Sequence, residues 1–277
     1  MKLLRYEREG KVGVGILDEG SILPLDWEGD TARLIAERGT EGISSLVKGS
    51  GERLDMVGAR IMAPIQRPGK IICLGRNYAA HAEESGMSVP DEPIIFPKAT
   101  SSVIGTGDPI IHHSICSRVD HEVELAVVIG SKSWKTGRAD AMEKVFGYTV
   151  LNDVSARNMQ IKDIELRNPW FRSKSLDTFC PMGPWVVTRE EIDDPQELDL
   201  ECRVNGDTRQ RGNTRDMIFP VEELIEFISS HMTLEPGDII STGTPEGISA
   251  IVPGDVVDCQ VQGVGTISNT VIPDPDR

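Results

Sequence analysis

The sequence lacks closely spaced cysteine pairs. Its five cysteines are scattered over 277 residues, their number is odd, and no two of them form a Cys-x-x-Cys pair. These features exclude a disulfide framework and argue against a zinc site. They are typical of free thiols in a reducing compartment.

Long apolar runs are missing too. No stretch approaches the length of a membrane span, and residues 1–9 carry charges where a signal peptide needs an apolar core. We therefore expect a cytoplasmic protein that does not bind to a membrane.

Positive charge is in short supply. The chain has 29 Lys and Arg against 44 Asp and Glu, so its formal net charge is −15. That charge repels nucleic acids and anionic membranes, so we expect no nucleic acid partner. An anionic ligand would need a local positive centre, such as a metal ion, a lysine or an arginine.

The chain also has no internal repeat, low-complexity tract or long linker. With 39% hydrophobic and 26% charged residues, its composition is that of an ordinary globular protein. From about residue 70, short apolar segments separated by Gly and Pro predict a strand-dominated domain rather than alternating strands and helices. The predicted strands are 71–74, 109–111, 122–129, 145–152, 185–188, 198–204, 238–241 and 256–261, and the predicted helices are 155–165 and 220–230.

Residues 1–66 have a different character, and they predict a small α+β domain. Its predicted strands are 3–6, 11–17 and 21–25, and its predicted helices are 31–37 and 42–47. Two prolines and a glycine within 64–69 break both periodicities and mark the best boundary. We therefore expect two domains, 1–66 and 67–277, with no catalytic constellation in the first.

A pair of glutamates on a predicted strand is the first sign of chemistry. Glu122 and Glu124 are two residues apart, so they point to one face of the strand, roughly 6.5–7 Å apart along it. Carboxylates this close repel each other unless a cation lies between them, and Mg²⁺ and Mn²⁺ prefer such hard oxygen ligands. The alternative is two solvated glutamates on an open strand face.

Asp153 lies where the predicted strand 145–152 gives way to a helix. It can cap that helix, or it can supply a third carboxylate to a metal site. Arg157 and Gln160 are three residues apart, so they would line one helical face beside it.

His81 and Glu84 are three residues apart on a predicted helical turn. A carboxylate beside an imidazole fixes its tautomer and raises its basicity, so this pair could take a proton from water. The alternative is an ordinary surface pair.

Two loops offer further candidates. Lys174 could stabilise an enolate oxygen if it lies near the carboxylates, or it could simply be solvated. Residues 241–247 are small, with hydroxyls and free backbone amides, which indicates either a carboxylate-binding loop or a plain turn.

Taken in order, these motifs resemble the fumarylacetoacetate hydrolase family. The resemblance runs from about residue 70 to 270, and residues 1–66 resemble the variable N-terminal domain of its two-part bacterial members. The motifs are Tyr78-x-x-His81-x-x-Glu84, His121-Glu122-x-Glu124, Asn152-Asp153-x-Ser155-x-Arg157-x-x-Gln160, Lys174-Ser175-x-Asp177-Thr178 and Thr242-Gly243-Thr244-Pro245-x-Gly247.

The resemblance implies a β-rich α+β fold, in which a mixed β-roll catalytic domain follows a small α+β N-terminal domain, usually in a homodimer. It also implies a divalent cation, Mg²⁺ or Mn²⁺, held by Glu122, Glu124 and Asp153.

Roles for the remaining motif residues follow from the same resemblance. His81 and Glu84 would form a catalytic dyad on a lid, and Lys174 would complete the catalytic set. The variable segment 168–172 would help to choose the substrate. The positions that would bind substrate are Tyr78, Arg157, Gln160 and Thr244.

The implied reaction is metal-dependent hydrolysis of a C–C bond in a 2,4-dioxo acid, either an acylpyruvate or a diketo sugar acid. It would release pyruvate or a related 2-oxo acid. An oxaloacetate-type decarboxylase and a 2-hydroxy-diene-dioate isomerase are the alternatives, because both need the same metal-stabilised enolate. The intact His81–Glu84 pair favours hydrolysis, since only hydrolysis needs an activated water. In each case the expected substrate is a small anionic 2-oxo acid.

Overall fold

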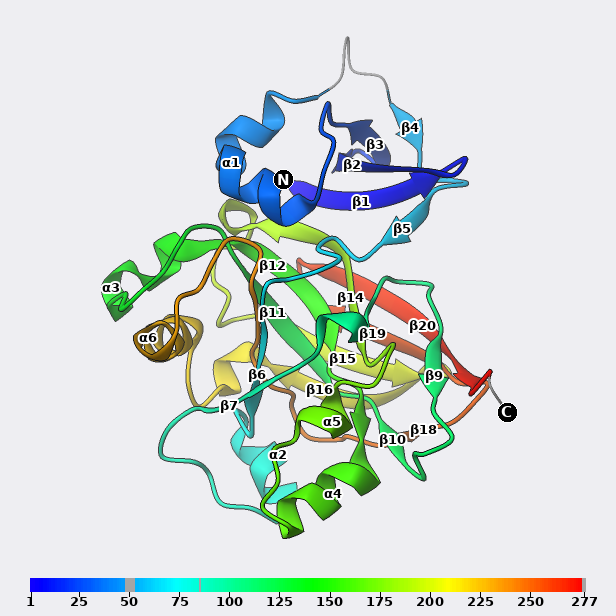
Figure 1. Cartoon of the computed structure of the whole chain (residues 1–277), viewed down its shortest axis with the longest axis vertical. Helices are drawn as coiled ribbons and strands as arrows, with labels where there is room; N and C mark the ends of the chain where they lie inside the picture. Colours follow the sequence, from blue (N-terminus) through cyan, green and yellow to red (C-terminus); the bar gives the residue numbers. More distant parts are fainter. Residues whose placement is uncertain (48–52, 85, 276–277) are drawn as a thin grey trace.

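Two long antiparallel strands lie at the centre of the fold. The computed structural model describes residues 1–47, 53–84 and 86–275, and Figure 1 shows their arrangement. β11 (Val123–Ile129) pairs with β12 (Val145–Asn152), and every residue of both strands is buried. A strand covered on both faces needs apolar side chains on both, which explains the continuous aliphatic run of β11 from Leu125 onward.

The two faces of β11 belong to different hydrophobic cores. Leu125 and Val127 lie in one cluster of buried side chains, and Ala126 and Val128 lie in another. Because successive side chains of a strand point to opposite faces, Glu124 shares the face of Ala126 and Val128.

A large mixed sheet is built around this pair of strands. Its main path runs β4-β3-β2-β1-β14-β12-β11-β17-β6-β7, and with β5 on β1 and β8 on β14 it has twelve strands. The additional bounds are β1 Lys2–Arg8, β2 Lys11–Asp18, β3 Ser21–Pro24, β4 Leu54–Asp55, β5 Arg60–Met62, β6 Ile71–Gly75, β7 Ile94–Pro97, β8 Val103–Ile104, β14 Cys180–Thr188 and β17 Ile239–Ser241.

Two smaller sheets complete the β structure. A five-stranded sheet, in the order β16-β15-β19-β20-β9, contributes apolar side chains to the cluster that contains Leu125. A three-stranded sheet has the order β13-β10-β18. Their bounds are β9 Ile110–His112, β10 Val119–Asp120, β13 Ser155–Ala156, β15 Asp199–Val204, β16 Asp207–Asn213, β18 Ala250–Ile251, β19 Val256–Val261 and β20 Gly265–Pro273.

Helices are short and lie around the sheets (Figure 1). α6 (Val221–His231) buries Leu224 and Ile228, as its helical spacing predicts. α4 (Arg157–Glu165) begins two residues later than predicted, because Ser155 and Ala156 pair with β10 as β13. The others are α1 Thr31–Ser44, α2 Ala79–Glu84, α3 Arg138–Ala141, α5 Phe171–Lys174 and the 3₁₀ helices Thr100–Ser102, Met142–Lys144, Arg189–Glu191 and Thr214–Asp216.

The N-terminal residues share both a sheet and a core with the rest of the chain. Leu3 of β1 pairs with Val186 of β14, and Leu34 of α1 lies in the same hydrophobic cluster as Ala126. The three predicted N-terminal strands are found as β1, β2 and β3. The domain boundary within 64–69 stays a prediction.

The two helices predicted at 31–37 and 42–47 form one interrupted element. α1 runs through both positions, with a non-helical Gly39 (φ 56°, ψ −174°) between its two parts. It ends at Ser44, and Val47 forms an isolated bridge with Leu25 instead of a further helical turn. Glycine tolerates the left-handed φ at this break because it has no Cβ.

β14 is longer than the strand predicted at 185–188, because it already begins at Cys180. Pro181 and Pro184 both lie within this strand, although proline is rare inside strands. The pairing of β12 with β14 shifts register between Tyr148 and Val150, opposite Pro184. The bulge interrupts the ladder of hydrogen bonds at this point. Proline has no N–H to donate, so its presence there costs no hydrogen bond between the strands.

Three global expectations can be compared with the structure. The fold is β-rich α+β, as predicted. All five cysteines are free and buried. Among the described residues, no helix combines the length and the apolar character that crossing a membrane would require.

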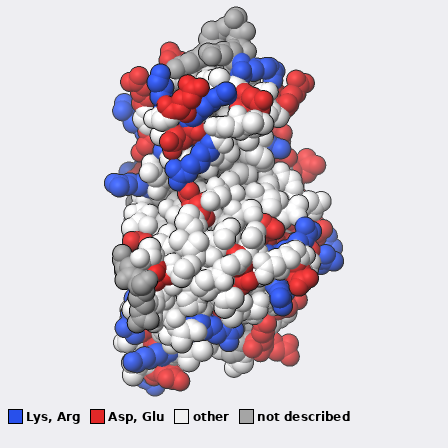
Figure 2. Space-filling view, turned by 90° about the vertical axis from the view of Figure 1, so that its right-hand side faces the viewer, with Lys and Arg blue, Asp and Glu red and all other residues white. Residues whose placement is uncertain are grey.

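Charge is unevenly distributed over one face of the molecule. Figure 2 shows Lys, Arg, Asp and Glu crowded toward the margins of this face, with mostly uncharged side chains across its middle. Residues of both signs of charge lie along these margins (Figure 2).

Leu125→Ala should lower the free energy of unfolding by about 2–5 kcal/mol, because truncating a fully buried side chain leaves a cavity. Leu166 is 57% exposed, so Leu166→Ala should cost no more than about 0.5 kcal/mol. Urea denaturation followed by circular dichroism measures both changes. Equal losses in the two variants would contradict the central place of β11 in the core.

Candidate active site

Three carboxylates meet where β11 begins and β12 ends. The two strands are in register there, and the Asp153 N–H donates to the Glu122 carbonyl oxygen at 2.8 Å. One oxygen of each of Glu122, Glu124 and Asp153 lies within 4.8 Å of the others. All three side chains are buried, which rules out the alternative of two solvated glutamates. We call these three residues the carboxylate triad.

Two buried lysines contact the carboxylate triad. Lys174 Nζ donates to Glu122 Oε2 at 2.7 Å and to Asp153 Oδ2 at 2.6 Å. Lys98 Nζ lies 2.5 Å from the other oxygen of Asp153. Charged groups at this depth are tolerated only when they are paired, and these lysines provide the opposite charge for Glu122 and Asp153.

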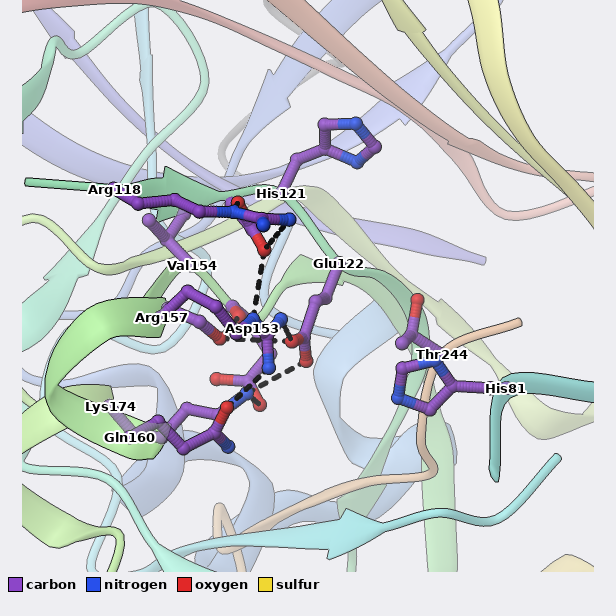
Figure 3. Close-up of polar contacts among 12 residues, drawn as sticks. His81, Arg118, His121, Glu122, Asp153, Val154, Arg157, Gln160, Lys174 and Thr244 are labelled. Carbon is purple, nitrogen blue, oxygen red and sulfur yellow. Dashed lines mark hydrogen bonds and ion pairs between the residues drawn. The ribbon is translucent and has the colours of Figure 1, made fainter. Parts of the chain in front are cut away.

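Two arginines extend the ionic contacts toward the surface (Figure 3). Arg157 contacts Glu122 and donates through Nε to Asp120 at 2.8 Å. Arg118 donates to the two oxygens of Asp120 at 2.8 and 3.0 Å. Positive and negative groups therefore alternate in one continuous set, which we call the charge chain. Its members, in order, are Arg118, Asp120, Arg157, Glu122, Lys174, Asp153 and Lys98.

Glu124 is the triad member outside the charge chain. It accepts hydrogen bonds from the Ser241 hydroxyl at 2.5 Å and from the Gly243 N–H at 2.9 Å, and no cationic group among the described residues pairs with it. Burial, followed by the negative charges of Asp153 and Glu122, raises the pKa of Glu124 to about 8.

The carboxylate triad fits a divalent cation. Although burial opposes the charge of Glu122, Lys174 and Arg157 lower its pKa below the usual range, whereas Glu124 has no such support. A cation among the three carboxylates would supply the positive charge that Glu124 lacks. The donor set consists of hard oxygen ligands, which Mg²⁺ and Mn²⁺ prefer.

The predicted dyad is assembled beside the carboxylate triad. His81 and Glu84 lie on α2, with His81 Nδ1 3.5 Å from Glu84 Oε2. Glu84 also accepts from the Gly247 N–H, which ties α2 to the loop 241–247. In Figure 3, His81 and Thr244 lie on the opposite side of Glu122 from Lys174. The predicted lid movement stays a prediction.

Asn77 holds the connection between β6 and α2 against the loop 241–247. Its side chain donates to the carbonyl oxygens of Phe219 and Thr242 at 3.1 and 2.8 Å. Gly243 has φ +95°, and a Cβ there would lie 2.8 Å from the Asn77 Cβ, so only glycine fits this approach. The loop 241–247 is thus packed tightly against the segment that leads into α2, and its role in binding a carboxylate stays a prediction.

A cavity of about 300 Å³ opens onto these groups. Eight of the ten predicted site residues line it, and its other walls are mainly apolar. The eight are His81, Glu84, Glu122, Glu124, Arg157, Gln160, Lys174 and Thr244. Arg157 contacts Gln160 on α4, as their i,i+3 spacing predicts.

The other two predicted residues lie behind the cavity wall. Asp153 is fully buried beneath Lys174 and Lys98. Tyr78 is 2% exposed, packs in the hydrophobic cluster with Leu125, and its hydroxyl has no hydrogen-bond partner among the described residues. Burial raises the pKa of this phenol, so it stays protonated.

Sequence reasoning missed three members of the charge chain. Lys98 gives no local signal, because its partner Asp153 lies far along the chain. Arg118 directly precedes β10 and Asp120 lies on it, so their spacing of two residues was a signal that could have revealed the pair. Trp170 also lines the cavity, from the segment 168–172 that was predicted to help choose the substrate.

The order of the motifs and the geometry of the site can now be compared with known proteins. The family model described as fumarylacetoacetate (FAA) hydrolase C-terminal matches residues 70–272. The chain belongs to the fumarylacetoacetate hydrolase family. The predicted resemblance is therefore confirmed.

Three relatives of this family member cover nearly its whole length. A mitochondrial oxaloacetate tautomerase of Xenopus laevis is 39% identical over 290 residues, which cover 98% of this chain and 90% of that protein. The structure of a fumarylacetoacetate hydrolase from Exiguobacterium antarcticum has a TM-score of 0.88 at 35% identity, over 99% of this chain and 100% of that chain. The structure of a Sphingobium maleylpyruvate hydrolase with manganese(II) and pyruvate has a TM-score of 0.84 at 32% identity, over 99% of both chains. The predicted fold is thus shared with the solved members of the family.

Mg²⁺ or Mn²⁺ should raise the melting temperature, and EDTA should abolish the gain. A ligand of the folded state at 100 times its Kd adds about 2.7 kcal/mol of stability. Glu124→Gln should remove this response, because the amide retains hydrogen-bonding capacity but loses the charge. Glu165→Gln, on the exposed surface of α4, should keep it. Differential scanning calorimetry with each cation tests the site, and an unchanged response in Glu124→Gln would remove the carboxylate triad from cation binding.

The affinity for the cation should rise with pH up to about 8. Glu124 has a pKa raised to about 8, so below that pH a proton on its carboxyl competes with the cation. The Kd should therefore increase about tenfold for each pH unit as the pH falls from 8 to 6. Calorimetric titration with Mn²⁺ across this range measures the slope, and a Kd independent of pH would contradict the competition.

Proposed function

We propose that this protein is a divalent-metal-dependent enzyme that acts on a small 2-oxo acid by stabilising its enolate. The observation that carries the proposal is one cavity onto which Glu122, Glu124, Lys174 and His81 all face. These groups offer cation ligands, a fixed positive charge and a base within a single space. Mg²⁺ or Mn²⁺ is the proposed metal.

Glu122, Glu124 and Asp153 would hold the cation. When bound, a divalent cation supplies a Lewis acid for the keto and carboxylate oxygens of a 2-oxo acid. The Sphingobium relative, whose structure contains manganese(II) and pyruvate, supports this pairing of metal and ligand.

Lys174 provides a positive charge of the protein's own. Although burial opposes its charge, Asp153 and Glu122 raise the pKa of Lys174, so the ammonium group persists at neutral pH. An ammonium that faces the cavity can donate a hydrogen bond to an oxygen on which negative charge develops.

His81 is the proposed base. The Glu84 carboxylate lies beside its Nδ1, which favours the tautomer with the proton on that nitrogen and leaves Nε2 free to accept one. Because the Gly247 N–H also holds Glu84, the orientation of the dyad is set by two contacts rather than one.

The first candidate reaction is hydrolysis of a C–C bond in a 2,4-dioxo acid. His81 takes a proton from water, and the water oxygen attacks the carbonyl carbon far from the carboxylate. The C–C bond then breaks, its electron pair goes to the enolate of pyruvate or a related acid, and Lys174 stabilises that charge. Protonation of the enolate carbon completes the 2-oxo acid product.

The second candidate is keto–enol tautomerisation of a 2-oxo acid. Here His81 would move a proton to or from the carbon next to the keto group, and no water takes part. The match with the Xenopus oxaloacetate tautomerase over 98% of this chain favours this reaction. Decarboxylation has less support, because it uses the enolate but needs no base.

His81→Asn should lower either reaction by about 10²–10⁴-fold, since it removes the base. The cation-dependent rise in melting temperature should persist, because His81 lies outside the carboxylate triad. His231→Asn, at the exposed end of α6, is the control and should leave the activity unchanged.

Two substrates separate the candidates in the presence of Mg²⁺. Loss of the enol absorbance of an acylpyruvate with release of pyruvate supports hydrolysis. Faster ketonisation of enol-oxaloacetate without cleavage supports tautomerisation. Full activity in His81→Asn would remove the dyad from both mechanisms, and no cation-dependent turnover of either substrate would count against the enolate proposal.

A further inference from the structure

Arg76 is a cationic group in the cavity wall that lacks a carboxylate partner. The other lysine and arginine side chains that line the cavity are Arg118, Arg157 and Lys174, and all three belong to the charge chain. Among the described residues, no carboxylate pairs with Arg76. Its positive charge is therefore available to an anion that enters the cavity.

The guanidinium of Arg76 is only partly satisfied. One terminal nitrogen donates to the Ser88 carbonyl oxygen at 2.9 Å. The Nε atom is buried and has no hydrogen-bond partner. A buried N–H without an acceptor costs free energy, so the contacts of the protein leave this guanidinium incompletely satisfied.

The backbone of Arg76 is held in a conformation that arginine rarely adopts. Its φ is +57°, in the left-handed region where glycine is favoured. On one side, a Cβ at Gly75 would lie 2.7 Å from the ring of Trp170, and on the other, Asn77 bonds to Phe219 and Thr242. Both neighbours fix the position, so the strained arginine is placed by the surrounding structure.

Apolar side chains also line the cavity. Leu74, Phe96 and Trp170 form part of this wall, and the rings of Phe96 and Trp170 pack edge to face at 5.5 Å between centroids. Such a surface suits the hydrocarbon part of a ligand whose charged ends bind elsewhere.

We infer that Arg76 forms a second anion subsite, which binds a carboxylate at the far end of the substrate. The substrate class is then the 2-oxo dicarboxylic acids rather than 2-oxo monocarboxylic acids. The inference rests on the proposed function, which assigns the carboxylate next to the keto group to the metal centre. The Arg76 guanidinium would bind the second carboxylate through the terminal nitrogen that does not donate to Ser88, in a charge-assisted hydrogen bond.

The test compares acids of equal length that differ only at the far end. Calorimetric titration in the presence of Mn²⁺ gives the Kd of 2-oxoglutarate against 2-oxopentanoate, and of 2-oxoadipate against 2-oxohexanoate. The wild-type protein should bind at least one diacid about tenfold or more tightly than its monoacid. Arg76→Gln should bring that ratio close to one while leaving the Kd of the monoacid unchanged.

Two further variants keep the outcome clear. Arg76→Gly removes the guanidinium but suits the left-handed backbone, so it should fold and also lose the diacid preference. Arg167→Gln is the matched control, because Arg167 is also an arginine with positive φ (56°), is exposed and does not line the cavity. It should keep the wild-type ratio.

Failure of this inference and failure of the proposed function give different results. Mn²⁺-dependent binding of monoacids without any diacid preference in the wild type would overturn the inference alone. So would an equal loss of both ligands in Arg76→Gln, which would show that Arg76 only supports the loop through Ser88. Absence of Mn²⁺-dependent binding of every 2-oxo acid would overturn the proposed function and the inference with it.

Discussion

The rest of the site depends on the strict alternation of sign along the charge chain. Its seven members come from four separate stretches of sequence, yet each buried ion has a neighbour of the opposite charge. An unpaired charge at this depth costs several kcal/mol, so no member can move far without exposing another to that penalty. The arrangement therefore fixes Glu122, Asp153 and Lys174 relative to one another before any ligand arrives. Glu124 is outside the charge chain, so a bound cation would supply the positive charge that this carboxylate lacks.

Strand geometry explains why the polar groups lie where they do. Alternation along β11 puts Glu124 on the same face as Ala126 and Val128, while Leu125 and Val127 pack on the other. The ionic groups lie where β11 begins and β12 ends. At this edge the strands leave the core and a cavity can open. The same pair of strands thus contributes packing along its length and ligands at its end.

Local features of the sequence predicted a large part of this. β11 and α6 follow from hydrophobic periodicity, and the His81–Glu84 pair follows from spacing within one helical turn. Contacts between distant segments could not be predicted. Lys98 looks like any solvated lysine until the fold brings Asp153 to it, and nothing within β1 indicates that it pairs with β14. The order of motifs predicted the family, but the choice of reaction does not follow from the residues, because one set of groups serves hydrolysis and tautomerisation alike.

The loop 241–247 donates hydrogen bonds to two carboxylates that belong to different parts of the site. Its Gly243 N–H donates to Glu124 of the carboxylate triad, and its Gly247 N–H donates to Glu84 of the dyad. A shift of this loop therefore acts on the cation ligand and on the partner of the base at the same time. Coupling of this kind is reciprocal. If cation binding stabilises the ordered position of His81, then ordering of His81 strengthens cation binding by the same free energy. The loop would then couple the carboxylate triad and the dyad thermodynamically, without a direct contact between them.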